Sequence, residues 1–421
     1  MFLKNSWLLI LIILLGLFLR AYNLERLAVF DYDQETAAVW IKNLIIDHKF
    51  SLVGQETSVG GVYIAPFFYF LLAPFYFLSG LNPLAGNIFV ILVSLLTMVF
   101  LYKWSRSHIA LFLYAIHPGI INFDRIVAPS NMAILLSTAT AYFLTKIRKT
   151  KLDYLFLGTI LGLTFSIHPP TILLIPICLL WFALKKEKVN LLFFLPIIIL
   201  VSPLIIFETR HGFVMAQNIF KFSQTDLYYP LLFRVILNLK LFLIYWSGIL
   251  ISSDLFFIKY PLMGLAVWLW IKNKDLVFRL WTLLPFLFLV FYPRPAPEYY
   301  LQMITPIVLV YSIKYLPKIF VLLIIVAGVI FSLLSLPKND NLLSFYYKNQ
   351  AVASLPKNTP VTIYYSADLG QNWGFNYLLW WQKVDVQNNS PKKYLFVIPA
   401  SREPQTSGII FGAVKVANIS R

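Results

Sequence analysis

The sequence predicts an all-α polytopic membrane protein with about eleven transmembrane helices and a small α/β domain at its C-terminal end. Composition gives the first reason: hydrophobic residues make up 59% of the 421 residues, and charged residues make up only 13%. A soluble domain carries about 25% charged residues. The second reason is that apolar runs long enough to cross a bilayer recur along the chain, with Lys and Arg gathered between them.

The basic residues predict how the runs are oriented. The formal net charge is +17, and it is concentrated in short clusters between the apolar runs. Such clusters are typical of cytoplasmic loops that face anionic lipid, so we expect no nucleic-acid partner. The clusters placed in the cytoplasm are Lys103/Arg106, Lys146/Arg148/Lys149/Lys151, Lys185/Lys186/Lys188, Lys272/Lys274/Arg279 and Lys314/Lys318.

The first apolar run follows Lys4 and has no small-residue cleavage site after it. We therefore interpret it as an uncleaved helix that starts in the cytoplasm of a multi-pass plasma-membrane protein. The chain must cross and return between consecutive basic clusters. The spans that satisfy this lie near residues 6–19, 83–102, 108–121, 130–145, 154–167, 171–184, 190–207, 255–270, 277–291, 299–313 and 318–336.

Two further apolar stretches, 62–78 and 235–251, are each long enough to span by hydropathy alone. Counting one of them as a crossing would invert every later basic cluster, and counting both would put three clusters outside. We therefore expect both to be interfacial or re-entrant helices on the outer side.

This topology divides the chain into a transmembrane domain, 1–336, and a small extracytoplasmic domain, 337–421. The first outer loop, 20–82, contains the amphipathic helices. Within the C-terminal domain, strands are indicated by three runs, VTIYYSAD, YLFVIPA and FGAVKVANI. The single cysteine, Cys178, excludes an intramolecular disulfide.

The densest group of acids opens the first outer loop, in the stretch FDYDQETAAVW from Phe30 to Trp40. An amphipathic helix is predicted from Asp33 onward, with Asp33 at the N-cap and Glu35 in the first turn. A purely structural use of these acids is one interpretation. The other is chemical: one carboxylate removes a proton from an acceptor hydroxyl, or Asp31 and Asp33 together hold a divalent cation that faces a phosphate.

Roughly the first 340 residues resemble the membrane-embedded glycosyltransferases of the C-type (GT-C) fold. The chain is most similar to the bacterial branch of the protein O-mannosyltransferases and the lipid A aminoarabinose transferases. The features that carry the resemblance are the pair Asp33–Gln34 in the first outer loop, APFFYFLLAP after it, FDRIVAPSN between the third and fourth spans, and FETRHGF after the seventh.

The resemblance implies a hexosyl- or pentosyltransferase. Such an enzyme takes a sugar from a polyprenyl-phosphate carrier and transfers it to a protein, lipid or glycan acceptor on the outer face. Asp33 inherits the role of general base, with Asp31 as its close competitor and Glu35 as the third catalytic candidate. Relatives carry an acid before the fourth span where this chain has Ser130 and Asn131. We therefore expect a metal-free mechanism without a cofactor, and Mg²⁺ or Mn²⁺ held by Asp31 and Asp33 is the alternative.

A leaving phosphate calls for a cation, and arginine can contact phosphate in a bidentate manner. The outer-side candidates are Arg294, Arg210, His211 and Arg125. Two of them have a local alternative, because Arg125 could pair with Asp124 and Arg210 with Glu208.

Two other functions compete with transfer. One is a transporter or flippase of lipid-linked sugars, and the other is a non-catalytic scaffold that displays the C-terminal domain. Transporters usually carry internal repeats and acids within their spans. Here the acids lie in outer loops and no repeat is visible, which favours the enzyme.

Overall fold

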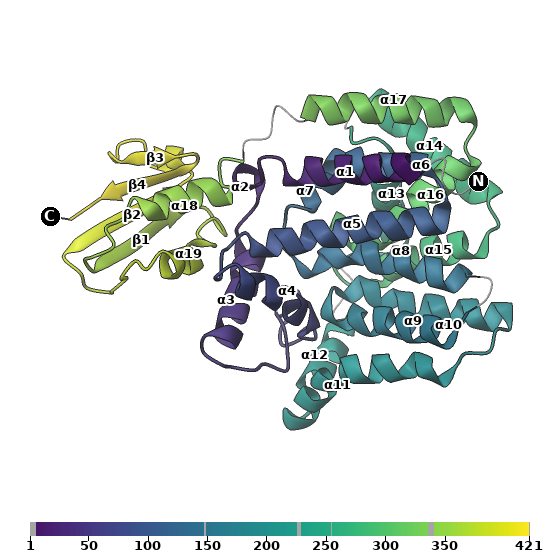
Figure 1. The fold of residues 1–421 in the computed structure, drawn as a ribbon, viewed down its shortest axis with the longest axis horizontal. Coiled ribbons are helices and arrows are strands. Elements are labelled where there is room, and N and C mark those ends of the chain that lie inside the picture. The colour runs from purple at the N-terminus through teal and green to yellow at the C-terminus, as the bar shows by residue number, and fades with distance from the viewer. Residues whose placement is uncertain (1–5, 147–148, 225–228, 254, 336–340, 421) are drawn as a thin grey trace.

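Apolar helices that run in roughly the same direction make up most of the molecule, and a small sheet domain stands at one end of them (Figure 1). The computed structural model describes residues 6–146, 149–224, 229–253, 255–335 and 341–420. The N-terminus lies at the end of the bundle away from the sheet domain, and the C-terminus lies at the far side of that domain (Figure 1).

The helices of the bundle overlap each of the eleven apolar runs. Proline 118 divides the third run into two helices, since a proline is accommodated at the first turn of a helix but not in its interior. The bundle helices are α1 Ser6–Ala21, α5 Ala85–Ser105, α6 His108–Ile116, α7 Pro118–Phe123, α8 Met132–Thr145, α9 Lys151–Leu163, α10 Leu174–Lys185, α11 Phe194–Arg210, α14 Phe256–Lys272, α15 Leu276–Phe291, α16 Thr305–Tyr315 and α17 Lys318–Ser335.

The number of membrane crossings stays a prediction. Within the described residues, four helices are long and apolar enough to cross a membrane by length and composition: Ala85–Ser105, Leu191–Arg210, Leu231–Leu250 and Lys318–Ser335. The other bundle helices are shorter than this limit or less apolar.

The basic clusters come together at one end of the bundle. Lys149 Nζ donates to Glu187 Oε2 over 2.9 Å, which joins the second and third clusters. Tyr311 OH donates to Asp275 Oδ1 over 2.6 Å, and its ring lies 6.3 Å from that of Trp104. The end of α8, the start of α9 and the connection α16–α17 are at the end where the N-terminus lies (Figure 1). This common end is what the positive-inside pattern requires.

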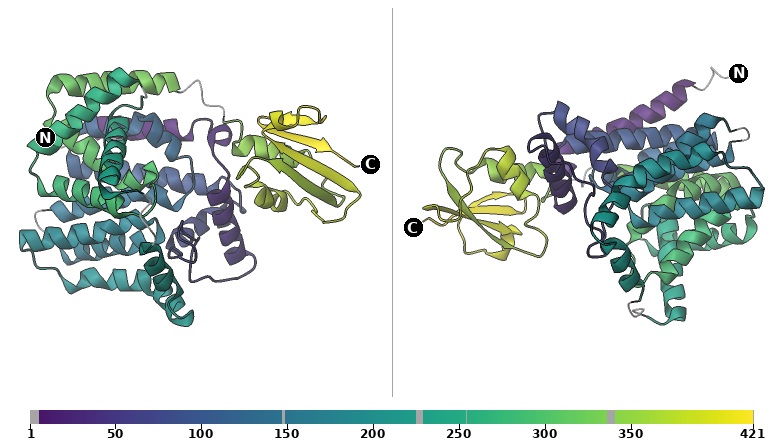
Figure 2. Two further views of the ribbon diagram at one scale, coloured as in Figure 1. Left: turned by 180° about the vertical axis from the view of Figure 1, so that it is seen from behind. Right: turned by 90° about the horizontal axis from the view of Figure 1, so that it is seen from below.

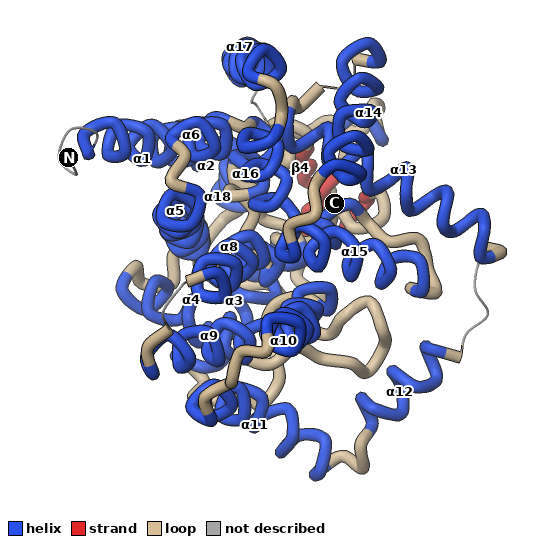
Figure 3. Tube along the Cα trace, turned by 90° about the vertical axis from the view of Figure 1, so that its right-hand side faces the viewer, coloured by secondary structure: helices blue, strands red, loops and turns tan. Residues whose placement is uncertain are grey.

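The two leftover apolar stretches form helices outside the parallel set. α4, Phe67–Leu78, lies beside α3, Tyr32–Ile45, at the end of the bundle near the sheet domain (Figure 1). Figure 3 looks along α5, α8 and α10, and in this view α13, Leu231–Leu250, is seen from the side. α13 therefore crosses the direction of the bundle, an arrangement compatible with the interfacial position expected for 235–251.

The C-terminal unit is a four-stranded sheet with order β1-β2-β4-β3. β1 runs parallel to β2, and the other neighbours are antiparallel. The three strand-like runs of the sequence fall on these strands. The elements are α18 Phe345–Ala353, β1 Val361–Ala367, α19 Phe375–Trp381, β2 Lys392–Ile398, β3 Ile409–Phe411 and β4 Val414–Asn418.

The sheet domain is joined to the bundle through its helices. α18 contacts α2, Leu24–Leu27, and α19 contacts α3; both helices lie on the side of the sheet that faces the bundle (Figure 2). Gly374 has φ +91°, and a Cβ added there would lie 2.0 Å from the Phe30 carbonyl oxygen. Only glycine fits at this contact, which brings the domain against the acidic stretch of the first outer loop.

Candidate active site

The acidic stretch forms the start of α3, and the N-cap residue is Asp31. The prediction of Asp33 at the N-cap is wrong, because the helix begins two residues earlier. The physical reason is a capping interaction: the Asp31 backbone N–H donates to Gln34 Oε1 over 2.9 Å. Asp33 is therefore a residue of the first turn.

The spacing of the acids on α3 separates their roles. Residues four apart lie on one face of a helix, and a residue midway between them lies on the opposite face. Asp31 pairs with Lys348 of α18. Glu35 accepts from the backbone N–H groups of Gly374 over 2.9 Å and of Tyr377 over 2.8 Å. These two carboxylates hold the C-terminal domain.

Asp33 faces a cavity instead. The cavity has a volume of about 560 Å³ and is walled by α3, the loop 55–58, the start of the 3₁₀ helix η1 (Pro129–Asn131) and the segment that includes Tyr299 and Tyr300. Burial raises the pKa of the Asp33 carboxyl above its usual value, a hydrogen bond from Gln55 lowers it, and the charge of Asp31 raises it. A carboxylate with a raised pKa in a cavity is suited to accept a proton.

Gln55 is the direct neighbour of this carboxylate, with Nε2 at 3.4 Å from Asp33 Oδ1. Its own amide oxygen accepts from Tyr69 OH over 3.0 Å. The Tyr69 ring stacks on Trp40 of α3 at a centroid distance of 4.9 Å. The segment APFFYFLLAP thus supplies the tyrosine that orients the amide beside Asp33.

An apolar cavity of about 960 Å³ adjoins the Asp33 cavity. The two share Thr57, Ile64, His168 and Pro169 in their walls. Most of its other lining residues are aliphatic or aromatic, and about half of them lie on α11, α12 (Val214–Ser223) and α15. A hydrocarbon chain can lie here while its polar end reaches Asp33.

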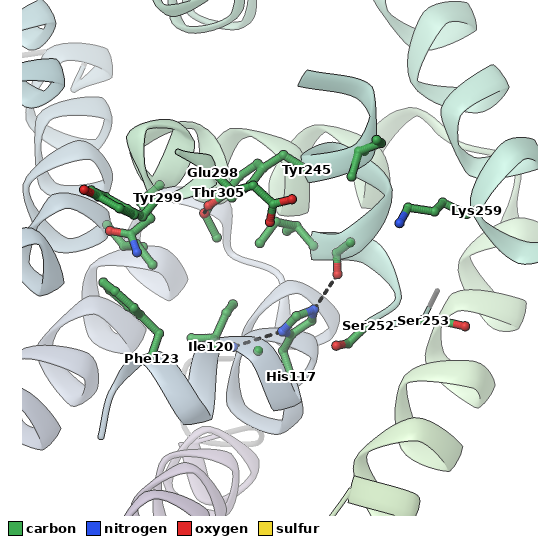
Figure 4. Close-up of a pocket in the computed structure, with 16 residues that line it drawn as sticks. His117, Ile120, Phe123, Tyr245, Ser252, Ser253, Lys259, Glu298, Tyr299 and Thr305 are labelled. Carbon is green, nitrogen blue, oxygen red and sulfur yellow. Dashed lines mark hydrogen bonds between the residues drawn. The ribbon is translucent and has the colours of Figure 1, made fainter. Parts of the chain in front are cut away.

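A third cavity, of about 470 Å³, adjoins the Asp33 cavity on another side and shares Phe123 and Tyr299 with it. Figure 4 shows its polar side chains, among them Glu298 and Lys259, coming from separate segments of the chain. Gln302 Oε1 is buried and has no hydrogen-bond partner in the part of the chain that the structure describes.

His117 belongs to this third cavity but has no free ring nitrogen. Its Nε2 lies 2.8 Å from the Gly248 carbonyl oxygen, and its Nδ1 accepts from the Ile120 N–H over 3.1 Å (Figure 4). The remaining acceptors, the Glu298 carboxylate and the Gln302 amide oxygen, suit a ligand that carries hydroxyl groups.

The cation candidates lie apart from Asp33, since none of the four lines its cavity. Arg125 is buried and donates to the carbonyl oxygens of Leu19 over 2.6 Å and Tyr22 over 3.3 Å. The local alternative for Arg125, an ion pair with Asp124, is wrong. Asp124 Oδ2 instead forms an ion pair with Arg20 Nε over 2.8 Å. Arg125 therefore holds the C-terminal end of α1.

Arg210 and His211, at the end of α11, are both exposed. The His211 ring stacks on Phe207 at 4.1 Å. Glu208 accepts from the backbone N–H groups of Met215 and Ala216, each over 2.9 Å, so it caps α12. Among the described ion pairs none joins Arg210 to Glu208, and the local alternative for Arg210 is not seen.

Arg294 lies with its guanidinium 5.2 Å from the centre of the Phe222 ring. It lines a fourth cavity, of about 160 Å³, together with Arg234 of α13. No motif in the sequence singles out Arg234, although a charge at the edge of an apolar run is a signal of a functional position. Lys348 is not singled out either, because its contact with Asp31 spans 317 positions and leaves no local pattern.

A metal site is not apparent in the described residues, which hold no group of three His, Cys, Asp or Glu side chains able to bind an ion. Asp31 and Asp33 also point to opposite sides of α3.

The comparisons with known proteins agree with this fold. Residues 64–207 match the family described as dolichyl-phosphate-mannose-protein mannosyltransferase. ArnT from Cupriavidus metallidurans, bound to undecaprenyl phosphate, shows 11% identity and a TM-score of 0.59, over 99% of this chain and 98% of the ArnT chain. Its apo state gives the same identity and TM-score over 98% of each chain. No curated protein sequence matches the chain.

The sequence resemblance pointed to the same two groups, the mannosyltransferases and the aminoarabinose transferases. The structural likeness extends over nearly the whole chain, and the family match covers the stretch from just before α4 to the last turn of α11. This protein therefore has the C-type fold of membrane glycosyltransferases.

Proposed function

We propose that this protein transfers a sugar from a polyprenyl-phosphate carrier to an acceptor on the outer face of the membrane, with Asp33 as the general base. One observation carries the proposal: the Asp33 cavity lies between an apolar cavity and a polar one and shares wall residues with each. A lipid-linked sugar and a hydroxylated acceptor can therefore meet at this carboxylate.

The carrier fits the apolar side. Its hydrocarbon chain takes the 960 Å³ cavity, and burial of apolar surface holds it there. The sugar then lies in the Asp33 cavity, whose tyrosines 32, 299 and 300 offer aromatic rings and hydroxyl groups. ArnT was solved with undecaprenyl phosphate bound, which supports a carrier of this class.

The reaction is a single displacement. The acceptor hydroxyl oxygen forms a bond to C1 of the sugar while the bond from C1 to the phosphate oxygen breaks. Asp33 takes the hydroxyl proton, and the polyprenyl phosphate leaves with the bonding electron pair. Attack from the face opposite the phosphate inverts the configuration at C1. The acceptor approaches from the cavity that contains Glu298 and Gln302.

Removing the base tests the proposal. Full-length protein is incubated with a panel of polyprenyl-phosphate sugars, with and without chelator, and release of the free carrier phosphate is measured. Asp33→Asn should lower the rate by about 10²–10⁴-fold, the usual contribution of a general base. The matched control is Asp47→Asn, an exposed acid just beyond the end of α3, which should keep the wild-type rate.

Unchanged release by Asp33→Asn would overturn the assignment of the base. Movement of the carrier across the membrane with its sugar intact would instead favour a flippase. Activity that survives the chelator would exclude a loosely bound Mg²⁺ or Mn²⁺.

A further inference from the structure

Gln302 is a buried amide with an unused hydrogen-bonding atom. The residue is 6% exposed, and its Oε1 has no partner in the part of the chain that the structure describes. A buried polar group without a partner is unfavourable. Gln302 lines the polar cavity of about 470 Å³, so the missing hydrogen bond comes from whatever fills this cavity.

The local helix places Gln302 in a row that starts at the Asp33 cavity. Gln302 lies on the 3₁₀ helix η5, Glu298–Ile304. Such a helix has three residues per turn, so side chains three apart lie above one another. Tyr299, Gln302 and Thr305 have this spacing, and all three line the polar cavity. Tyr299 also lines the Asp33 cavity, and Gln302 follows it by one turn, about 6 Å.

The far end of this row offers a hydrogen-bond donor. Thr305 Oγ1 and Tyr245 OH lie 2.7 Å apart, and both residues line the polar cavity. One hydroxyl hydrogen is used between the two groups, and the other is available to a ligand oxygen. The Gln302 amide and the Glu298 carboxylate add acceptors. Because a hydroxyl group both donates and accepts, it suits each of these groups.

The size and the walls of the polar cavity suit a sugar ring. A volume of about 470 Å³ lies within the roughly 300–1,000 Å³ usual for small-molecule sites. Figure 4 shows Tyr299 and Thr305 on one side of the cavity and Phe123 and Ile120 on the other. A sugar has apolar C–H faces and a rim of hydroxyl groups. Aromatic rings can pack on its faces while the polar row takes its rim.

The charges of the described lining do not select an anion. His117 is neutral, because its Nδ1 accepts a hydrogen bond. The other acidic and basic side chains are Glu298 and Lys259, one of each sign. A phosphorylated acceptor would bring negative charge into the cavity that contains the Glu298 carboxylate. A neutral ligand avoids this repulsion.

The number of hydroxyl groups separates a glycan from a protein acceptor. A serine or threonine side chain offers one hydroxyl, and the reaction uses it at Asp33. A sugar offers one hydroxyl to Asp33 and keeps others for Gln302 and Glu298. The row on η5 gives these further hydroxyls their partners.

We propose that the polar cavity binds a sugar ring of the acceptor, which is a neutral glycan, and that Gln302 and Glu298 position this ring. The inference rests on the proposed transfer reaction and names the acceptor class for it. Gln302 binds a hydroxyl that does not react, while another hydroxyl of the same ring reaches Asp33. The glycan is either free or the headgroup of a glycolipid, which present the same chemistry.

The first test is transfer by full-length protein in detergent, from the polyprenyl-phosphate sugar that gives carrier release. The acceptors are methyl and octyl glycosides of neutral sugars, a peptide containing Ser and Thr, and a sugar phosphate. We expect a neutral glycoside to accept the sugar. A lower KM for the octyl than for the methyl glycoside identifies a glycolipid headgroup, and equal values identify a free glycan. Failure of every neutral glycoside to accept overturns the proposal.

The second test uses Gln302→Met, which keeps the length of the side chain and removes its hydrogen bonds. Wild-type protein should disfavour one single-deoxy glycoside about 5- to 10-fold in kcat/KM, the loss of one hydrogen bond. Gln302→Met should no longer distinguish this analogue from its parent, a change that a purely structural role does not produce. Gln217→Met is the matched control. Gln217 is exposed and lines neither the polar cavity nor the Asp33 cavity, so this variant should keep the discrimination.

Glu298→Gln is the second variant, since Glu298 is exposed and its replacement leaves folding intact. It should raise the KM for the glycoside. The proposal is overturned if Gln302→Met keeps the discrimination and Glu298→Gln keeps the KM.

Asp33→Asn separates this inference from the proposed reaction. The variant should lose transfer and still bind the preferred glycoside, measured as a rise in Tm at saturating ligand. Loss of transfer in Asp33→Asn, with no glycoside bound by either protein, overturns the glycan site alone. Unchanged transfer in Asp33→Asn, with discrimination that depends on Gln302, overturns the base alone.

Discussion

The properties of Asp33 come from its immediate neighbours. Burial and the charge of Asp31 both raise the pKa of its carboxyl, and the hydrogen bond from Gln55 works against them. A general base must be ionised, so activity falls as the pH drops through this pKa. The effect of this pKa on the pH dependence of folding stability is opposite to that of a salt-bridged acid, whose pKa is lowered. A raised pKa contributes stability that is fully present below pH 3.8, the usual pKa of an aspartate, and this stability is lost as the pH rises through the raised pKa.

Replacing Gln55 should move the acidic limb of the pH–rate profile. Gln55→Met removes the hydrogen-bond donor that lowers the pKa of Asp33, so the acidic limb should shift to higher pH. The measurement is kcat/KM against pH. Thr57→Val, in the same cavity wall, is the control. A limb that stays in place in Gln55→Met would show that another group titrates.

At this scale the sequence predicted the acidic cluster, and the resemblance named Asp33 ahead of Asp31 as the base, but neither gave the directions in which the three side chains point. Helical spacing separates Asp33 from Asp31 and Glu35, and this could have been anticipated. The partners of the outer two acids could not, because they lie more than 300 residues away in the chain. For the same reason Arg125 was considered as a ligand for phosphate, while its contacts are with the carbonyl oxygens at the end of α1.

Among the elements, α3 has two functions on two faces. One face presents Asp33 to the cavity, and the other receives the start of α19 through Glu35. The apolar runs predicted the bundle helices well, because twenty apolar residues leave few alternatives in a membrane. The start of α3 and the direction of α13 were harder to predict, since capping and packing decide them rather than hydropathy.

Removing the Glu35 carboxylate should loosen the C-terminal domain. Glu35→Ala leaves two buried N–H groups without acceptors, which costs about 2–4 kcal/mol in total. Hydrogen exchange measured by mass spectrometry should then show faster exchange across Phe375–Trp381, with α5 unchanged. Glu25→Ala, an exposed acid of α2, is the control. Equal protection of α19 in Glu35→Ala and wild type would contradict the docking contact.

The whole molecule has two unlike ends. The basic clusters gather at one end with the N-terminus, while the sheet domain, α3 and α4 lie at the other (Figure 1). The positive-inside pattern predicted this separation from sequence. The three cavities around Asp33 were beyond sequence reasoning, because their walls combine residues from loops and helices spread over most of the bundle.

Labelling of single cysteines tests the orientation. Cys178 is buried, so the wild-type protein gives little background with a membrane-impermeant maleimide. Ser401→Cys, in the sheet domain, should react in intact cells. Lys188→Cys, in a basic cluster, should react only after permeabilisation. The reverse pattern would place Asp33 on the cytoplasmic side and remove the proposed chemistry.

A structure of the full-length protein with a non-transferable polyprenyl-phosphate sugar is the most direct test of the central assignment. The account predicts the prenyl chain in the apolar cavity and C1 of the sugar in the Asp33 cavity, with space for an acceptor hydroxyl within about 3 Å of the carboxylate. A sugar bound in a cavity that Asp33 does not line would contradict the account.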